Sequence, residues 1–208
     1  MKTVDKLTNK VSHNKKMLTF LIGILIIGIL AGSLFIVILN SADKTLIKEH
    51  LEAFITSVST NKLDYTQSLI SSLGSNLFYV IVIWLLGISV IGMPIIVFIY
   101  FAKAFILGFS VSSIIYQYKL KGCLLAFFYV FPHHILSILL YTFLMLYSLS
   151  LSIRVSKTLL AKKTLDFKII MRRYSMVLVI SLIGAVIVSL LEVFLMPNLI
   201  RFIIPIIK

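Results

Sequence analysis

The chain has 208 residues, of which 60% are hydrophobic and 13% are charged. This composition, with a mean hydropathy of +1.10, excludes a water-soluble domain, because a chain of this length could not cover so much apolar surface. The net charge of +13 does not indicate nucleic-acid binding. Basic residues gather in 2–16 and 154–173, where they flank apolar blocks as cytoplasmic segments facing anionic lipid do, and no basic face of a folded module is visible. The predicted partner is therefore membrane lipid.

The first predicted element is a transmembrane helix over residues 18–39. It follows a lysine-rich tail, residues 1–17, and it carries no charge. As a helix this block is about 33 Å long, which is enough to cross a bilayer. A cleaved signal peptide has a shorter apolar region that ends in a small-residue cleavage site. The block is therefore interpreted as a retained helix whose N-terminus lies inside.

Residues 40–76 form a long polar segment that is predicted to lie outside the cell. Three lysines stand against four acidic residues, so the segment is slightly acidic, whereas cytoplasmic loops are rich in Lys and Arg. Apolar residues recur at helical spacing between Leu46 and Val58, which predicts an amphipathic helix. Such a helix either lies on the outer membrane interface or binds an extracytoplasmic partner. Leu51 and Phe54 are the candidate partner-binding residues.

Residues 77–101 and 104–118 are predicted to form the second and third crossings. A kink or break is expected at Pro94, because proline removes a backbone donor and clashes with the preceding turn. The stretch 104–118 is about 22 Å long as a helix, which is less than the hydrocarbon core of about 30 Å. Its length leaves open whether it crosses fully. A crossing is favoured, because the basic segment 154–173 would otherwise lie outside.

Residues 122–153 and 174–196 are predicted to form the fourth and fifth helices. The segment 154–173 between them is predicted to be a basic cytoplasmic loop. The fifth helix is expected to stop at Pro197, and residues 197–208 are expected to form a tail at the outer interface. The chain is thus predicted to be one all-α, polytopic membrane bundle of about five transmembrane helices. It lies in the bacterial cytoplasmic membrane with the N-terminus inside and the C-terminus outside, and its oligomeric state is left open.

Glu192 is the first candidate functional residue, because a carboxylate within a membrane span costs several kcal/mol unless it faces protein or water. Ser181, Ala185 and Ser189 repeat every fourth position, and Glu192 falls on the same stripe of the helix. Small residues at this spacing allow close helix packing. One interpretation is that Glu192 fixes this helix in a bundle or lines a polar path. The other is that it lies one turn below the outer surface, before Pro197, and reaches the headgroups.

His133 and His134 follow Pro132, which interrupts the fourth predicted helix. They are candidates for a metal site, a proton relay, a partner of Glu192 or a structural hydrogen bond. Two adjacent histidines point to different sides of a regular helix, and no Cys, Asp or Glu in that block completes a metal site. The structural hydrogen bond is therefore favoured, and neither a metal nor a cofactor is expected.

Lys103 and Gly108 complete the candidate residues. Lys103 is interpreted as a cytoplasmic anchor that extends to the headgroups, with a functional role as the alternative. Gly108 pairs with Ser112, and Gly28 pairs with Gly32, at the small-xxx-small spacing that supports helix packing.

Motifs of several enzyme classes are missing from the chain. The sequence has no His-Glu-x-x-His zinc motif, no Gly-x-Ser-x-Gly nucleophile turn and no phosphate-binding loop. No enzymatic activity is therefore expected, and an intramembrane hydrolase is kept as a minor alternative.

Four short motifs, in their order and spacing, resemble the stage II sporulation protein M family. They follow a first anchor and a long outside loop, and the likeness covers most of the chain. The motifs are Asn76-Leu77-Phe78, Lys103-Ala104-Phe105-Ile106-Leu107-Gly108-Phe109, Phe131-Pro132-His133 and Leu191-Glu192-Val193-Phe194 followed by Pro197. Many members have Pro-His-Gly and a Glu shortly afterwards, where this chain has His134 and then Ser137. The role of that Glu is therefore not carried over.

The resemblance implies a non-enzymatic membrane scaffold. In endospore formers such a protein is similar to the subunit that holds peptidoglycan-degrading enzymes at the engulfing membrane. Relatives also stand beside genes for export of, or immunity to, antimicrobial peptides such as bacteriocins, where the expected partners are transporter subunits. Both settings are kept as expectations.

Overall fold

The computed structural model describes residues 2–60, 63–160 and 167–207, and its regular elements are all helical. In these ranges five stretches are long and apolar enough to cross a membrane. The protein is therefore a multi-pass membrane protein, as predicted. The elements in chain order are α1 (Lys2–Ile38), α2 (Ser41–Ser59), α3 (Tyr65–Ile88), α4 (Gly92–Tyr129), α5 (Phe131–Leu160), α6 (Phe167–Leu190), the π-helix η1 (Leu191–Leu195) and α7 (Met196–Ile207).

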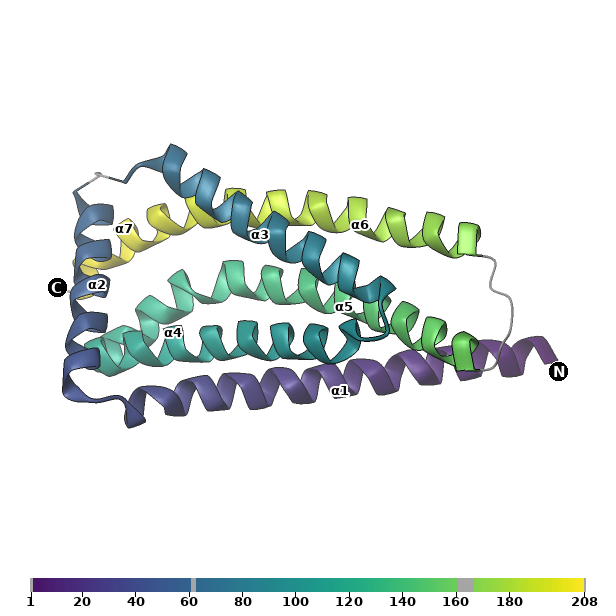
Figure 1. Cartoon of the computed structure of the whole chain (residues 1–208). Helices are drawn as coiled ribbons and strands as arrows, with labels where there is room; N and C mark the ends of the chain where they lie inside the picture. Colours follow the sequence, from purple (N-terminus) through teal and green to yellow (C-terminus); the bar gives the residue numbers. More distant parts are fainter. Residues whose placement is uncertain (1, 61–62, 161–166, 208) are drawn as a thin grey trace.

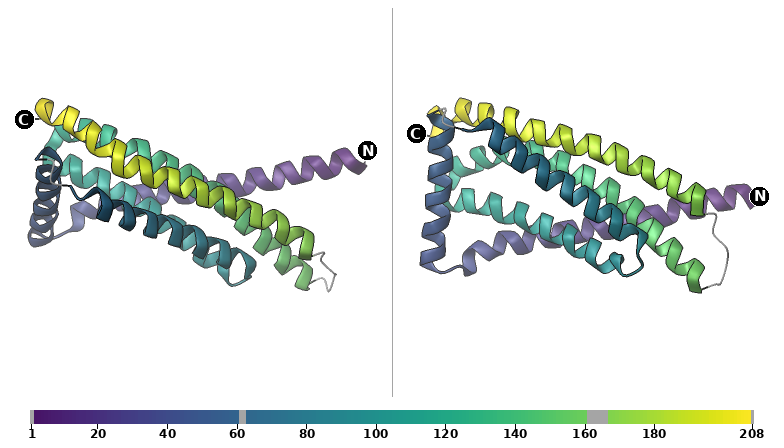
Figure 2. Two further views of the ribbon diagram at one scale, coloured as in Figure 1. Left: turned by 90° about the horizontal axis from the view of Figure 1, so that it is seen from above. Right: turned by 45° about the horizontal axis from the view of Figure 1, so that its top comes forward.

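The long helices form one bundle in which successive crossings alternate in direction (Figure 1). Helix α2 does not run with them. It lies across one end of the bundle, here called the α2 end, beside the C-terminal helix α7 (Figures 1 and 2). The N-terminus lies at the opposite end. The predicted all-α bundle of five crossings is confirmed, whereas which end faces the cytoplasm stays a prediction.

The second and third crossings have other bounds than the sequence predicted. The stretch 77–101, expected as one helix, belongs to two helices that meet at a turn over residues 89–91. The break expected near Pro94 is therefore present, just before it in the chain. Pro94 lies in the first turn of α4, where backbone N–H groups have no partner within the helix, so it starts the new helix. At this turn the backbone of Leu86 leaves no room for a side chain on Gly92.

The stretch 104–118 is part of α4 and is not a short helix of its own. From Gly92 to its break at Lys119, where φ is 51°, α4 is about 40 Å long, so its length no longer argues against a full crossing. Residues 65–76, expected in the outside loop, form the first turns of α3. Their polar side chains lie on one face of that helix, which explains why a segment of low hydropathy belongs to a membrane span.

Helices α1 and α4 pack through small residues. A side chain added at Gly28 would lie 2.6 Å from the Cβ of Ala104. Gly32 meets the carbonyl of Phe105, and Gly108 meets the carbonyl of Ile29, at distances too short for any side chain. The predicted packing role of Gly28, Gly32 and Gly108 is thus what the structure shows.

Helix α2 is fixed to the α2 end by its apolar face. Leu51 and Phe54 are half-buried and pack on a cluster formed by Val58, Ile114, Leu125, Ala126, Val130 and Ile200. From α7, Arg201 donates hydrogen bonds to the Val58 carbonyl, at 3.0 Å, and to the Tyr65 hydroxyl, at 2.9 Å. The predicted amphipathic helix is therefore present, and its apolar face contacts the bundle.

The last crossing continues beyond the point predicted from the sequence. Helix α6 passes through η1 directly into α7, so Pro197 does not end the helix. The segment expected as a tail at the outer interface is helical as far as Ile207, and its place at the interface stays a prediction. The wider turn of a π-helix disturbs the regular i→i−4 hydrogen bonds, and the missing N–H of a proline costs little beside such a turn.

Candidate functional site

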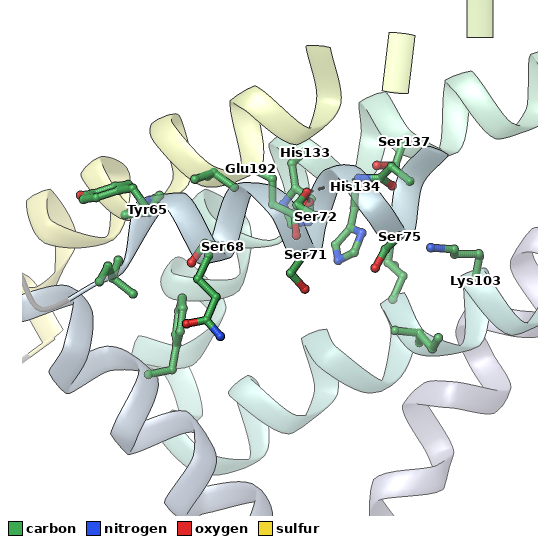
Figure 3. A pocket seen from close by; sticks show the side chains of 18 of the residues that line it. Tyr65, Ser68, Ser71, Ser72, Ser75, Lys103, His133, His134, Ser137 and Glu192 are labelled. Carbon is green, nitrogen blue, oxygen red and sulfur yellow. Dashed lines mark hydrogen bonds between the residues drawn. The ribbon is translucent and has the colours of Figure 1, made fainter. Parts of the chain in front are cut away.

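A cavity of about 640 Å³, lined by both polar and apolar side chains, lies between the helices near the α2 end (Figure 3). Helices α3, α4 and α5 and the π-helix η1 form its walls, and Phe54 of α2 contributes from the end. The polar side chains that line it are those of Asp64, Tyr65, Gln67, Ser68, Ser71, Ser72, Ser75, Asn76, Lys103, His133, His134, Ser137, Tyr141 and Glu192.

Serine side chains on one face of α3 form a polar wall of the cavity. Ser68, Ser72 and Ser75 are four and three residues apart, and Ser71 and Asn76 stand next to them on the same face. Sequence reasoning missed this wall, because it placed the segment in an outside loop. The serine spacing was the available signal.

Asn76 connects three helices at the bottom of the cavity. Its side-chain amide donates to the Ser189 hydroxyl at 2.9 Å and to the Ser72 hydroxyl at 3.4 Å. The Tyr141 hydroxyl donates to the Asn76 carbonyl oxygen at 2.7 Å. Asn76 is buried, so these bonds satisfy a polar group that would otherwise destabilise the bundle. Asn76 appeared in the sequence analysis as part of a motif and not as a site residue.

Glu192 faces the cavity. Its carboxylate accepts a hydrogen bond of 2.7 Å from Ser72. Ser189, on the predicted stripe, belongs to the same network, while Ser181 and Ala185 are fully buried further along α6. Glu192 also lies in η1, and isolated turns of this kind occur frequently at functional sites. The first interpretation of Glu192 agrees with this position in the cavity, and its function stays a prediction.

Lys103 lies within the membrane-spanning part of α4, so its interpretation as a cytoplasmic anchor is wrong. It is half-buried, about 16 Å along α4 from Gly92. Its ammonium lies 3.6 Å from the centroid of the Tyr79 ring and 5.2 Å from that of Tyr141. Lys103 was expected at the end of a helix, next to a turn in the chain. The turn instead lies at residues 89–91, so Lys103 falls inside α4.

His133 and His134 both line the cavity, with ring centroids 4.0 Å apart. The expectation that they point to different sides is wrong. Both residues lie in the first turn of α5, where Cα–Cβ bonds tilt toward the helix start and the side chains extend into the cavity. Pro132 is the second residue of α5, a position that suits proline. In the part of the chain that the structure describes, no group of three or more His, Cys, Asp or Glu side chains gathers at metal-binding distance.

The fold and the cavity define a class: multi-pass helical membrane proteins with charged side chains enclosed between their helices. Within that class, residues 17–197 match the family described as Stage II sporulation protein M, and the chain belongs to this family. No curated protein and no solved structure matches the chain. The matched region contains every residue that lines the cavity. Family membership makes this a sporulation-related membrane protein.

Proposed function

We propose that the protein is a non-enzymatic membrane scaffold that holds peptidoglycan-degrading enzymes at the extracytoplasmic face of the membrane during sporulation engulfment. Family membership supports a sporulation setting. The observation that carries the proposal is α2, a helix that lies across the end of the bundle without spanning it. Such a helix presents a rigid surface to a partner at little cost in conformational entropy.

The outward face of α2 is the proposed contact surface. Leu51 and Phe54, first considered as contacts, pack against the bundle, so a partner would meet the opposite face of the helix. Leu46, Glu49, His50 and Ala53 are exposed there, and Leu46 is 53% exposed. One apolar side chain among polar neighbours suits a small, specific protein interface.

The distribution of charge supports an outward-facing α2 end. Lys15 and Lys16 of α1 lie towards the opposite end, and Arg154 and Lys157 at the end of α5 and Lys168 at the start of α6 lie there too. Under the positive-inside rule this basic end is cytoplasmic, which puts α2 on the side where the cell wall is built.

Leu46→Lys tests the scaffold directly. The change alters the outward face of α2 without touching its packing, so crosslinked co-purification of wall hydrolases from sporulating cells should be lost at normal protein level. Leu120→Lys is the matched control, because Leu120 is 85% exposed just after the break in α4 and lies outside α2. Hydrolase recovery that is equal for both variants would reject the contact surface.

The cavity favours a second function, a membrane subunit of an antimicrobial-peptide export or immunity system. Its supporting observation is that Glu192 and Lys103 both face a cavity between the membrane-spanning helices. In that case Glu192→Gln should weaken export or resistance at normal protein level. Deletion of the gene separates the two functions: a block in engulfment supports the scaffold, whereas sensitivity to the peptide supports export or immunity.

A further inference from the structure

The cavity is lined by Lys103 and by two carboxylates, Asp64 and Glu192. Asp64 caps the start of α3, where it accepts from the backbone N–H groups of Thr66 and Gln67, whereas Lys103 and Glu192 do not pair with each other. Within the described part of the chain, no ion pair joins the Lys103 ammonium to the Glu192 carboxylate. Lys103 rests on the rings of Tyr79 and Tyr141, and Glu192 accepts from Ser72. Figure 3 shows the two charged groups apart from each other, with His134 between them in this view.

Both charged groups have unused bonding capacity. An ammonium carries three N–H donors, and among the described residues no acceptor receives a hydrogen bond from Lys103. A carboxylate has about four acceptor positions, of which the Ser72 hydroxyl occupies one. A charged group within a membrane span costs free energy unless it interacts with an opposite charge or a hydrogen-bonding group. A ligand with both an anionic and a cationic group could therefore interact with Lys103 and Glu192 at the same time.

The mouth of the cavity opens sideways. Exposed lining residues mark its rim: Asp64, which precedes α3, Gln67, Ser68, Ser71 and Ser75 on α3, and Ile106 on α4. The rim therefore begins at the α2 end and continues along the lateral wall between two membrane-spanning helices. A headgroup that enters from the bilayer would therefore pass serine hydroxyls before it meets the charges.

We propose that this cavity binds a zwitterionic group, with a primary ammonium on Glu192 and a phosphate or carboxylate on Lys103. The sideways mouth favours the phosphoethanolamine headgroup of a membrane lipid as the source, with a soluble zwitterion of the same chemistry as the alternative. The cavity of about 640 Å³ falls within the size of small-molecule sites, about 300–1,000 Å³. The proposal is independent of the scaffold role.

The test measures lipid binding by the purified, delipidated full chain in detergent. Short-chain phosphatidylethanolamine is titrated against short-chain phosphatidylglycerol, which has the phosphate but lacks the amine. The first should bind about tenfold more tightly or better, since its amine can meet Glu192. Equal affinity of the two lipids in the wild-type protein overturns the proposal without recourse to any variant.

Two cavity variants then assign the ends of the ligand. Lys103→Met should weaken both lipids about tenfold, because it removes the partner of the phosphate. Glu192→Gln should weaken phosphatidylethanolamine alone and so reduce the preference over phosphatidylglycerol. Lys48→Met and Glu52→Gln are matched controls, because these residues form an exposed ion pair on α2 and should leave both affinities unchanged. A preference that survives Glu192→Gln contradicts the assignment.

Glycerophosphoethanolamine, which has no acyl chains, distinguishes the source. Competition with phosphatidylethanolamine by this compound shows that the headgroup is recognised and supports the lipid as ligand. Binding of the soluble compound without binding of the lipid assigns the site to a soluble zwitterion and keeps the charge assignment. Failure of both compounds to bind overturns the proposal.

Discussion

Asn76→Leu is the sharpest test of how the cavity is held together. Leucine has nearly the size of asparagine but cannot form hydrogen bonds. The substitution would remove the bonds of Asn76 to Ser189 and Tyr141, which connect α3 with α6 and α5, and its bond to Ser72 within α3. The expected result is a bundle that folds but is less stable.

The magnitude follows from the number of bonds and from the groups left behind. Side-chain hydrogen bonds between membrane helices contribute about 0.6 kcal/mol on average and about 1.7 at most, so the two interhelical bonds, to Ser189 and Tyr141, amount to about 1 kcal/mol. The buried Tyr141 and Ser189 hydroxyls would also lose a partner, and each orphaned group costs about 1–3 kcal/mol when no water reaches it. Because water in the cavity can satisfy part of this loss, we expect a total of about 2–4 kcal/mol.

The assay is reversible unfolding of purified protein in mixed micelles, followed by circular dichroism as denaturing detergent is added. Asn198→Leu is the control, because Asn198 is exposed and bonds to the Phe194 carbonyl within its own helix region, at 2.9 Å. It should cost no more than about 0.5 kcal/mol. If Asn76→Leu costs no more than this control, Asn76 does not connect the helices in the way described.

Three further changes test other parts of the structure. Gly32→Val should lower the free energy of unfolding by about 1–3 kcal/mol or more, because the backbone of Phe105 leaves no room for a side chain. Gly23→Val should have little effect, since no atom of a neighbouring residue would lie within 4 Å of its added Cβ. Equal effects of the two changes would contradict the α1–α4 packing. Arg201→Met should loosen the attachment of α2 to the bundle, because it removes the hydrogen bonds from this charged donor to the Val58 carbonyl and the Tyr65 hydroxyl. The measurement is amide hydrogen exchange in residues 41–59, which should become faster. Unchanged exchange would show that the apolar face of α2 is enough to hold the helix in place. The predicted orientation can be tested by labelling single cysteines in a Cys123→Ser background. Lys48→Cys, on the side predicted to be outside, should react with an impermeant maleimide in intact cells, whereas Lys157→Cys should react only after permeabilisation. The reverse pattern would show that the orientation is inverted.

Hydropathy predicted the fold class and the number of crossings, because each crossing needs about 20 apolar residues and basic residues mark the cytoplasmic segments. It did not predict where the second crossing begins. Average hydropathy ignores which face of a helix a residue occupies, so the segment with the serines of α3 was predicted as a loop, although these serines line a cavity between helices.

The candidate site was predicted in part. Glu192, His133 and His134 stood out because charged and ionisable groups are rare in membrane spans. The position of Lys103 depends on the turn at residues 89–91, which Pro94 allows but does not determine, since a proline suits both a kink and a helix start. The role of Asn76 depends on three helices meeting, and this is visible only in three dimensions.

The glycine contact between α1 and α4 has a consequence for biosynthesis. Ser33 donates a hydrogen bond of 3.3 Å to the Gly108 carbonyl across a separation of 75 residues, so the partner of α1 is made long after α1 itself. At about 5–20 residues per second, translation takes about 4–15 s to supply it. During this time the glycine face of α1 contacts lipid or the insertion machinery, and α3 is made first without docking there. Final assembly of the bundle therefore waits for α4, and a chain that stalls before α4 presents an unpartnered glycine face to membrane quality control.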